Sequence, residues 1–175
     1  MCANEETMVT RAFPKPRERL PNFTLPSSEG RRIALYDYHG RRNVVLALVG
    51  RPVGEAARAR LTALAARYAE FLAEEAEVLA VVWGAVGEAE RVKRQDALPF
   101  PVLADEAGAL HSSLGALASD GEAAWAFYIT DRFGEVFAAY RAGAGRSVPT
   151  VEEMLEWLRF IGLQCPECGV SEWPA

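Results

Sequence analysis

Two uninterrupted apolar runs, separated by a long amphipathic segment, constrain the fold of this chain more than any other feature. The runs occupy residues 43–49 and 78–83. Apolar runs of this kind are typical of strands that are buried on both faces of a mostly parallel sheet. Between them, residues 55–74 carry apolar side chains at helical spacing, namely Ala57, Leu61, Leu64, Ala65, Tyr68, Phe71 and Leu72. A strand, a helix and a second strand predict a right-handed crossover in an α/β domain.

The remaining segments extend this pattern at both ends. Short strands and helices are expected as an N-terminal hairpin (22–25 and 31–35), a charged helix (88–97), a strand (100–105), a small helix (107–114) and a second hairpin (125–129 and 136–141). The last helix should begin at a capping box, Thr150 with Glu153, and end at Gly162 as its C′ glycine. We therefore expect an α/β fold of three layers: a mixed central sheet flanked by helices, with a short N-terminal hairpin and a C-terminal tail.

Length and charge predict one domain and exclude some partners. We divide the 175 residues into an irregular lead-in (1–19), one domain (20–162) and a tail (163–175). The net charge of -5, from 24 acidic and 19 basic residues, argues against a dedicated nucleic-acid binder. The first residues have no apolar segment typical of a secretory signal, and no apolar run approaches the ~20 residues that span a bilayer. We expect a cytoplasmic protein with no nucleic acid or membrane partner.

Four short segments resemble one known family. They are Leu20-Pro-Asn-Phe-Thr-Leu-Pro, the stretch from Leu35 through Asp37 and Gly40 to Leu46, Phe100-Pro-Val-Leu-Ala-Asp with Gly108, and Phe127-Tyr-Ile-Thr-Asp with Gly134. In this order they resemble the alkyl hydroperoxide reductase and thiol-specific antioxidant family, which is peroxiredoxin-like and also called redoxin. The resemblance covers residues 20–162 and implies a thioredoxin-like fold and a thiol-based antioxidant oxidoreductase.

The resemblance also implies that the family's reactive cysteine is missing. In that family the cysteine lies in the first turn of the helix after the central strand, in a Pro-x-x-x-Thr-x-x-Cys motif. Alignment of the helix through its leucines places Ala57 at the cysteine position, and Gly54 where a thioredoxin carries its first active-site cysteine. Trp125 falls near the place where peroxiredoxins have an arginine and thioredoxins a cis-proline. No cysteine lies between Cys2 and Cys165, so an error of a few residues in the alignment would not supply one.

The tail contains the motif Cys165-Pro-Glu-Cys168-Gly, which has three interpretations. A redox-active dithiol needs two cysteines within bonding reach, which this spacing allows. A zinc knuckle would use both thiolates, and Cys2 with a histidine, or a second tail across a homodimer axis, would complete four ligands. The third interpretation is a pair of inert free thiols.

Other polar and aromatic residues have weaker functional interpretations. Arg51 stands beside a helix N-terminus, where it could help to bind an anion or be a plain surface arginine. Trp83 and Trp125 lie near strand ends and could line a pocket or belong to the core. His39 and His111 have no partner that the sequence identifies, and we interpret both as structural or solvated.

Two hypotheses for function follow. The first is a non-catalytic thioredoxin-fold module for binding or assembly, without standard peroxidase activity. The alternative is a thiol oxidoreductase that reduces a peroxide or a disulfide with Cys165 and Cys168 and needs a thiol reductant or protein partner.

Overall fold

The computed structural model describes residues 14–51, 53–117, 124–142 and 148–164. Between β3 and β6, strands and helical segments alternate, as the apolar runs predict. The strands are β1 (Thr24–Pro26), β2 (Arg32–Ala34), β3 (Asn43–Val49), β4 (Ala76–Val82), β5 (Val102–Ala104), β6 (Ala126–Thr130) and β7 (Val136–Arg141). The helices are the 3-10 helix η1 (Leu35–Tyr38), α1 (Glu55–Ala66), α2 (Tyr68–Ala73), α3 (Val86–Gln95), α4 (Ala109–Ser113) and α5 (Val151–Gly162).

Five strands form one mixed sheet in the order β5-β4-β3-β6-β7. The pairs β3–β4 and β4–β5 are parallel, whereas β6 is antiparallel to both β3 and β7. Helices join the strands of both parallel pairs, and the antiparallel pair β6–β7 is the predicted closing hairpin. The hairpin β1–β2 forms a separate two-stranded sheet. The predicted mixed α/β architecture is confirmed.

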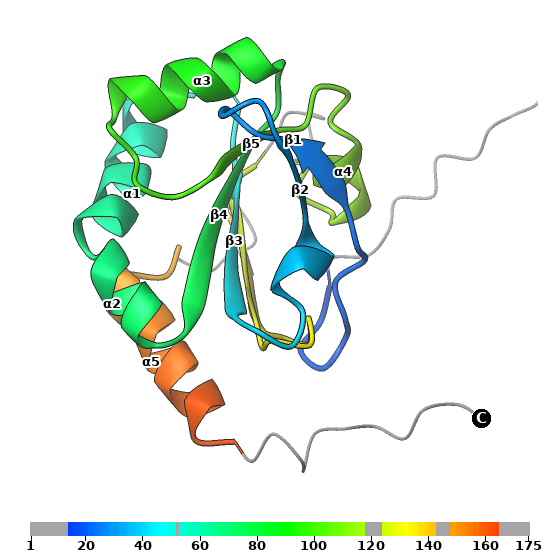
Figure 1. Ribbon diagram of the computed structural model, residues 1–175, viewed down its shortest axis with the longest axis vertical. Coiled ribbons are helices and arrows are strands. Elements are labelled where there is room, and N and C mark those ends of the chain that lie inside the picture. The colour runs from blue at the N-terminus through cyan, green and yellow to red at the C-terminus, as the bar shows by residue number, and fades with distance from the viewer. Residues whose placement is uncertain (1–13, 52, 118–123, 143–147, 165–175) are drawn as a thin grey trace, which may run out of the picture.

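The sheet is covered on both faces, because β3 sends alternate side chains to opposite sides. Val45 and Val49 join the core cluster formed with α1, α2, α3 and α5. Val44 and Leu46 join a second cluster with the N-terminal hairpin, η1 and α4. Figure 1 shows α1, α2 and α5 on one side of the sheet and the hairpin with α4 on the other. All seven residues of β3 are buried, so the prediction of a doubly covered strand is confirmed.

The prediction of one helix over residues 55–74 is wrong, because the helix is interrupted at Arg67. There the φ angle is -117°, and the N–H donates to the carbonyl of Leu64, three residues back, at 3.3 Å. This tighter turn changes the direction of the chain, and α2 begins after it as a separate helix. As a result Phe71 is fully buried, whereas Leu72 is 37% exposed although it belongs to the predicted apolar stripe.

Two other element ends differ from the sequence-based expectation. The second strand stops at Ala34, where the N–H donates to the Asp37 carboxylate at 2.8 Å and η1 begins. At the other end of the chain, Gly162 is the last residue of α5 and is not left-handed, and Leu163 after it is also helical. The C′ glycine prediction is therefore wrong, whereas the Thr150 capping box is confirmed. None of the helices in the described ranges combines the length and the apolar composition that a membrane span requires.

Candidate functional site at the carboxyl ends of the parallel strands

The carboxyl ends of β3, β4 and β5 meet at one edge of the sheet, which is where ligands bind in open α/β folds. The register pairs Val49 with Val82, and Val82 with Ala104, so the three strands end side by side. The residues that follow them, together with the start of α1, form the candidate site. The segment after β3 is the one in which the family resemblance places the reactive cysteine.

The first turn of α1 presents no thiol or hydroxyl. Gly54 is the N-cap in extended conformation, and no side chain caps the helix. Glu55 places a carboxylate in this turn, next to the partial positive charge of the helix start. Ala57 is 4% exposed and packs into the core cluster on this face of the sheet. Arg58 turns away, since its Nε donates to the carboxylate of Asp96 at 2.8 Å.

A buried pair formed by Asp105 and His111 lies directly after β5. Nδ1 of His111 lies 2.8 Å from Oδ2 of Asp105, and the His111 backbone N–H donates to the same oxygen at 2.9 Å. Nε2 of the ring lies 3.3 Å from the carbonyl oxygen of Val49, the last residue of β3. The pair therefore ties α4 to the ends of two strands. Of the two interpretations of His111, the structural one is confirmed, and its partner, which the sequence did not identify, is Asp105.

Two opposing effects set the pKa of Asp105. Burial on its own would raise the pKa, because an apolar environment disfavours the charged carboxylate. The hydrogen bonds from the His111 side chain and backbone outweigh burial, and the pKa lies below its ordinary value. Because the His111 ring is completely buried, no substrate touches it in this arrangement, and we assign the pair a structural role.

Trp83 covers this pair from the side of β4. Its ring stacks on the His111 ring, with 5.9 Å between the centroids. The guanidinium carbon of Arg51 lies 5.7 Å from the Trp83 ring centroid on the solvent side, a cation–π arrangement. Gly108 accommodates the indole, since it adopts φ +67° and a Cβ there would lie 2.3 Å from the Trp83 Cε2. Arg51 is thus an exposed arginine that packs on an aromatic ring.

Trp125 directly precedes β6 and belongs to the core. It is 7% exposed and stacks on Phe127, with 5.3 Å between the ring centroids. An arginine does reach this position, but it comes from α1: the guanidinium carbon of Arg60 lies 5.4 Å from the Trp125 ring centroid. His39, by contrast, is exposed and lies in the turn after η1, before β3 begins and thus at the opposite end of β3 from this site.

The model of the AhpC/TSA family matches residues 16–139. The chain belongs to the AhpC/TSA family. This match spans every strand of the central sheet except the last two residues of β7. A comparison with curated protein sequences found no match.

Solved structures of other AhpC/TSA-type proteins share the fold. The crystal structure of peroxidoxin BcpB from Mycobacterium tuberculosis is similar, with a TM-score of 0.74, 16% identity and coverage of 84% of this chain and 97% of that chain. For AhpC from Enterococcus faecalis the TM-score is 0.73, at 20% identity, with 91% of this chain and 98% of that chain covered. A reduced 2-Cys peroxiredoxin from Plasmodium vivax has a TM-score of 0.72 at 18% identity, with 84% and 96% coverage. At these identities the likeness shows the thioredoxin-like, peroxiredoxin-like fold.

The cysteines of this AhpC/TSA protein lie outside the described residues. Cys2, Cys165 and Cys168 are all in the terminal segments, so the redox, zinc and inert interpretations stay predictions. In the described ranges no group of three or more His, Cys, Asp or Glu side chains could hold a metal ion.

Sequence reasoning missed the Asp105–His111 pair, although a signal was present. A carboxylate directly after a buried strand, followed at a spacing of three by Gly108 and then by His111, brings both side chains to the same turn. The contact with Trp83 could not be predicted from this spacing, because Trp83 follows a different strand.

Proposed function

We propose that this AhpC/TSA-family protein lacks the standard peroxidase reaction and acts as a non-catalytic thioredoxin-fold module for binding or assembly. The supporting observation is the position of Ala57, buried in the first turn of α1 after the central strand. In the family resemblance this turn carries the reactive cysteine.

The thiol-peroxidase reaction requires a sulfur atom, which the methyl side chain of Ala57 does not provide. In thiol-peroxidase catalysis a thiolate sulfur attacks one oxygen of the peroxide, the O–O bond breaks, and the sulfur becomes a sulfenic acid while the other oxygen leaves and takes a proton. Alanine has no electron pair to donate. Glu55, the acidic side chain of this turn, is a carboxylate that would disfavour a neighbouring thiolate.

The alternative places the chemistry at Cys165 and Cys168, and it is supported by their C-x-x-C spacing. Gln164, the last described residue before them, lines a cavity with Asn43, the first residue of β3. The start of α1 follows the other end of β3, about 20 Å away at ~3.3 Å per residue. Four residues of chain extend at most about 14 Å. A thiol of the tail would therefore reach the start of α1 more readily from a second copy of the chain, as in the predicted homodimer.

Peroxide consumption tests the proposal. Purified protein with a small-molecule dithiol as reductant is given hydrogen peroxide or an organic hydroperoxide, and the loss of peroxide is compared with that caused by the reductant alone. We expect no increase for the wild type or for the Cys165→Ser/Cys168→Ser variant. Turnover by the wild type that the double variant loses would establish the alternative, and turnover retained by both would contradict both hypotheses.

Elemental analysis combined with thiol titration distinguishes the interpretations of the tail. Zinc bound at one ion per chain or per dimer, lost in the double variant, would establish the knuckle. A reversible loss of two thiols after peroxide, without metal, would instead establish a dithiol. Unchanged thiols without metal would show that both cysteines are inert.

A further inference from the structure

A small cavity lies at the end of the domain opposite to α1, and no role assigned so far includes it. It has a volume of about 200 Å³ and is formed where η1 and the β6–β7 turn meet the lead-in, which in the structure continues as irregular chain to Phe23, just before β1. This volume is below the range of drug-sized pockets, about 300–1,000 Å³, and leaves room for one small molecule. Its residues do not take part in the Asp105–His111 pair or in the start of α1.

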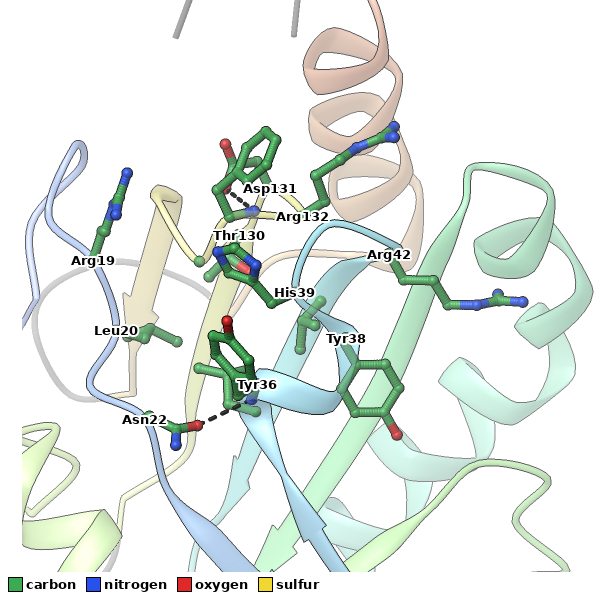
Figure 2. Close-up of a pocket in the computed structure, with 14 residues that line it drawn as sticks. Arg19, Leu20, Asn22, Tyr36, Tyr38, His39, Arg42, Thr130, Asp131 and Arg132 are labelled. Carbon is green, nitrogen blue, oxygen red and sulfur yellow. Dashed lines mark hydrogen bonds between the residues drawn. The ribbon is translucent and has the colours of Figure 1, made fainter. Parts of the chain in front are cut away.

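Backbone hydrogen bonds hold the walls of this cavity in place. The lead-in is fixed to the hairpin, since the N–H of Leu20 donates to the carbonyl of Gly134 at 3.0 Å. Across the cavity, the N–H of Tyr36 donates to the Asn22 side-chain oxygen at 3.0 Å, which leaves the amide hydrogens of Asn22 available. Figure 2 shows the lead-in with Leu20 on one side and the Tyr36 and His39 rings on the other.

The inner surface is apolar and the rim is aromatic. Leu20, Leu35 and Val44 are buried and line the inner surface. At the rim the Tyr36 and His39 rings are stacked, with 4.9 Å between centroids and planes 14° apart. The Phe133 ring meets His39 edge-on at 5.7 Å. Tyr36 is 66% exposed although its ring is large, so a flat ligand could contact it without displacing protein atoms.

Positive charge surrounds the cavity. Three arginines line it, Arg19, Arg42 and Arg132, and Arg132 is paired with Glu75 at 3.0 Å. Figure 2 shows the heads of Arg42 and Arg132 pointing away from the centre, and the Arg19 head lying along the lead-in wall, from which a rotation of the side chain would bring it to a ligand. The one carboxylate among the described lining residues is Asp131, and its Oδ1 accepts the backbone N–H groups of the turn, from Phe133 at 2.8 Å and Glu135 at 2.9 Å.

Thr130 adds an unsatisfied donor to the lining. It is completely buried, and its hydroxyl has no hydrogen-bond partner within the described part of the chain. Buried hydroxyls are normally paired, because an unpaired one costs free energy. Figure 2 places Thr130 beside the His39 ring, at the inner end of the cavity, where an acceptor atom of a ligand could pair with it after a rotation of the side chain.

We infer that this cavity is a binding site for a small organic anion with a flat apolar body, such as an aromatic carboxylate. The ring would lie against the inner surface of Leu20, Leu35 and Val44. The carboxylate would lie between the Arg19 guanidinium and the Thr130 hydroxyl, each brought to it by a rotation of its side chain. The site is independent of the proposed function, because it lies at the other end of β3 from α1.

Titration with benzoate, followed by amide chemical shifts of labelled protein, tests this inference. A saturable response confined to residues 19–22, 36–44 and 130–134 is expected, with a Kd of about 1 mM for so small a ligand. Arg19→Gln should weaken binding about fivefold, the size of effect of one partly exposed charge. Arg41→Gln is the matched control, since Arg41 is exposed and lies outside the lining.

Two further probes and one further variant complete the test. Benzyl alcohol keeps the ring and lacks the charge, whereas inorganic phosphate keeps the charge and lacks the ring; both should bind at least tenfold more weakly than benzoate. Thr130→Val should weaken benzoate binding without lowering stability, because it removes a hydroxyl that has no partner. Equal binding of either probe, an unchanged Kd in Arg19→Gln, or shifts spread over the whole surface would overturn the inference.

Discussion

Gly108 decides how closely Trp83 approaches the turn after β5. Because a Cβ would lie 2.3 Å from the Trp83 indole and the φ angle is +67°, Gly108→Ala combines a clash with a left-handed backbone. We expect a loss of about 3 kcal/mol in the free energy of unfolding, measured with denaturant. The matched control is Gly87→Ala in α3, where no heavy atom lies within 4 Å of the added Cβ, and a gain of about 0.5 kcal/mol is expected there. Equal stabilities of the two variants would contradict this account of Trp83.

The Asp105–His111 pair makes stability depend on pH in a defined direction. The folded-state pKa of Asp105 is lowered, so its contribution is complete above the unfolded value of 3.8 and is lost as the pH falls through the lower folded value. Asp105→Asn should cost about 1.5–3 kcal/mol at neutral pH, because an amide oxygen accepts the two His111 hydrogen bonds more weakly than a carboxylate does. The gap between wild type and variant should narrow below pH 3.8, and exposed Glu106→Gln should change stability by less than about 0.5 kcal/mol. A gap that stays constant down to acid unfolding would show that the carboxylate charge is not involved.

At the scale of single residues, the burial of strand side chains could be predicted from the sequence, whereas the contacts between side chains of the candidate site could not. The burial of Val45 and Leu46 follows from an apolar run, which is a local property of the chain. The contact of Arg51 with Trp83 joins residues from two different loops, and its geometry depends on the strand register. Apolar patterns in the sequence identify the strands but not the register in which they pair. Contacts that depend on this register therefore could not be predicted.

Among the elements, α5 has the clearest start signal. The N–H of Glu153 donates to the Thr150 hydroxyl at 3.2 Å, and the Thr150 N–H donates to the Glu153 carboxylate at 2.7 Å. Thr150→Ala should therefore lower the free energy of unfolding by about 1 kcal/mol. Thr62→Ala in the middle of α1 is the control: its exposed hydroxyl bonds to the carbonyl of Arg58, so its loss should be neutral or slightly stabilising. A larger loss at position 62 than at position 150 would contradict the role of the cap.

The helix ends show which element boundaries the sequence specifies. Two side chains, Thr150 and Glu153, specify the start of α5, and this start was predicted correctly. The interruption at Arg67 carries no proline or glycine, and the apolar spacing continues through it. It arises because α2 packs Phe71 against β4 and aims the Tyr68 hydroxyl at Glu77, at 2.6 Å. Tertiary packing, which no local pattern records, sets this boundary.

At the scale of the whole molecule, the fold tolerates far more substitution than a reactive site does. The AhpC/TSA architecture persists at 16–20% identity with solved relatives, because burial of alternating side chains tolerates many substitutions of similar size. A reactive site tolerates far fewer, since it depends on a handful of atoms in fixed positions. The three-layer arrangement was therefore predictable from the chain alone, whereas an activity depends on single side chains, such as the one at position 57, that the fold does not specify.

Introducing a thiol at position 57 tests whether the first turn of α1 supports a reactive one. In a background with Cys2, Cys165 and Cys168 changed to serine, Ala57→Cys can be compared with Ala56→Cys, one residue earlier and exposed. The thiol at position 57 would face the apolar core, which raises the pKa of a thiol and shields it from reagent. We expect it to react with a disulfide reagent at least about tenfold more slowly than the thiol at position 56, with unfolding curves confirming that both variants are folded. If the thiol at position 57 reacted faster, the first turn of α1 would activate a nucleophile, and the prediction of a shielded thiol would be contradicted.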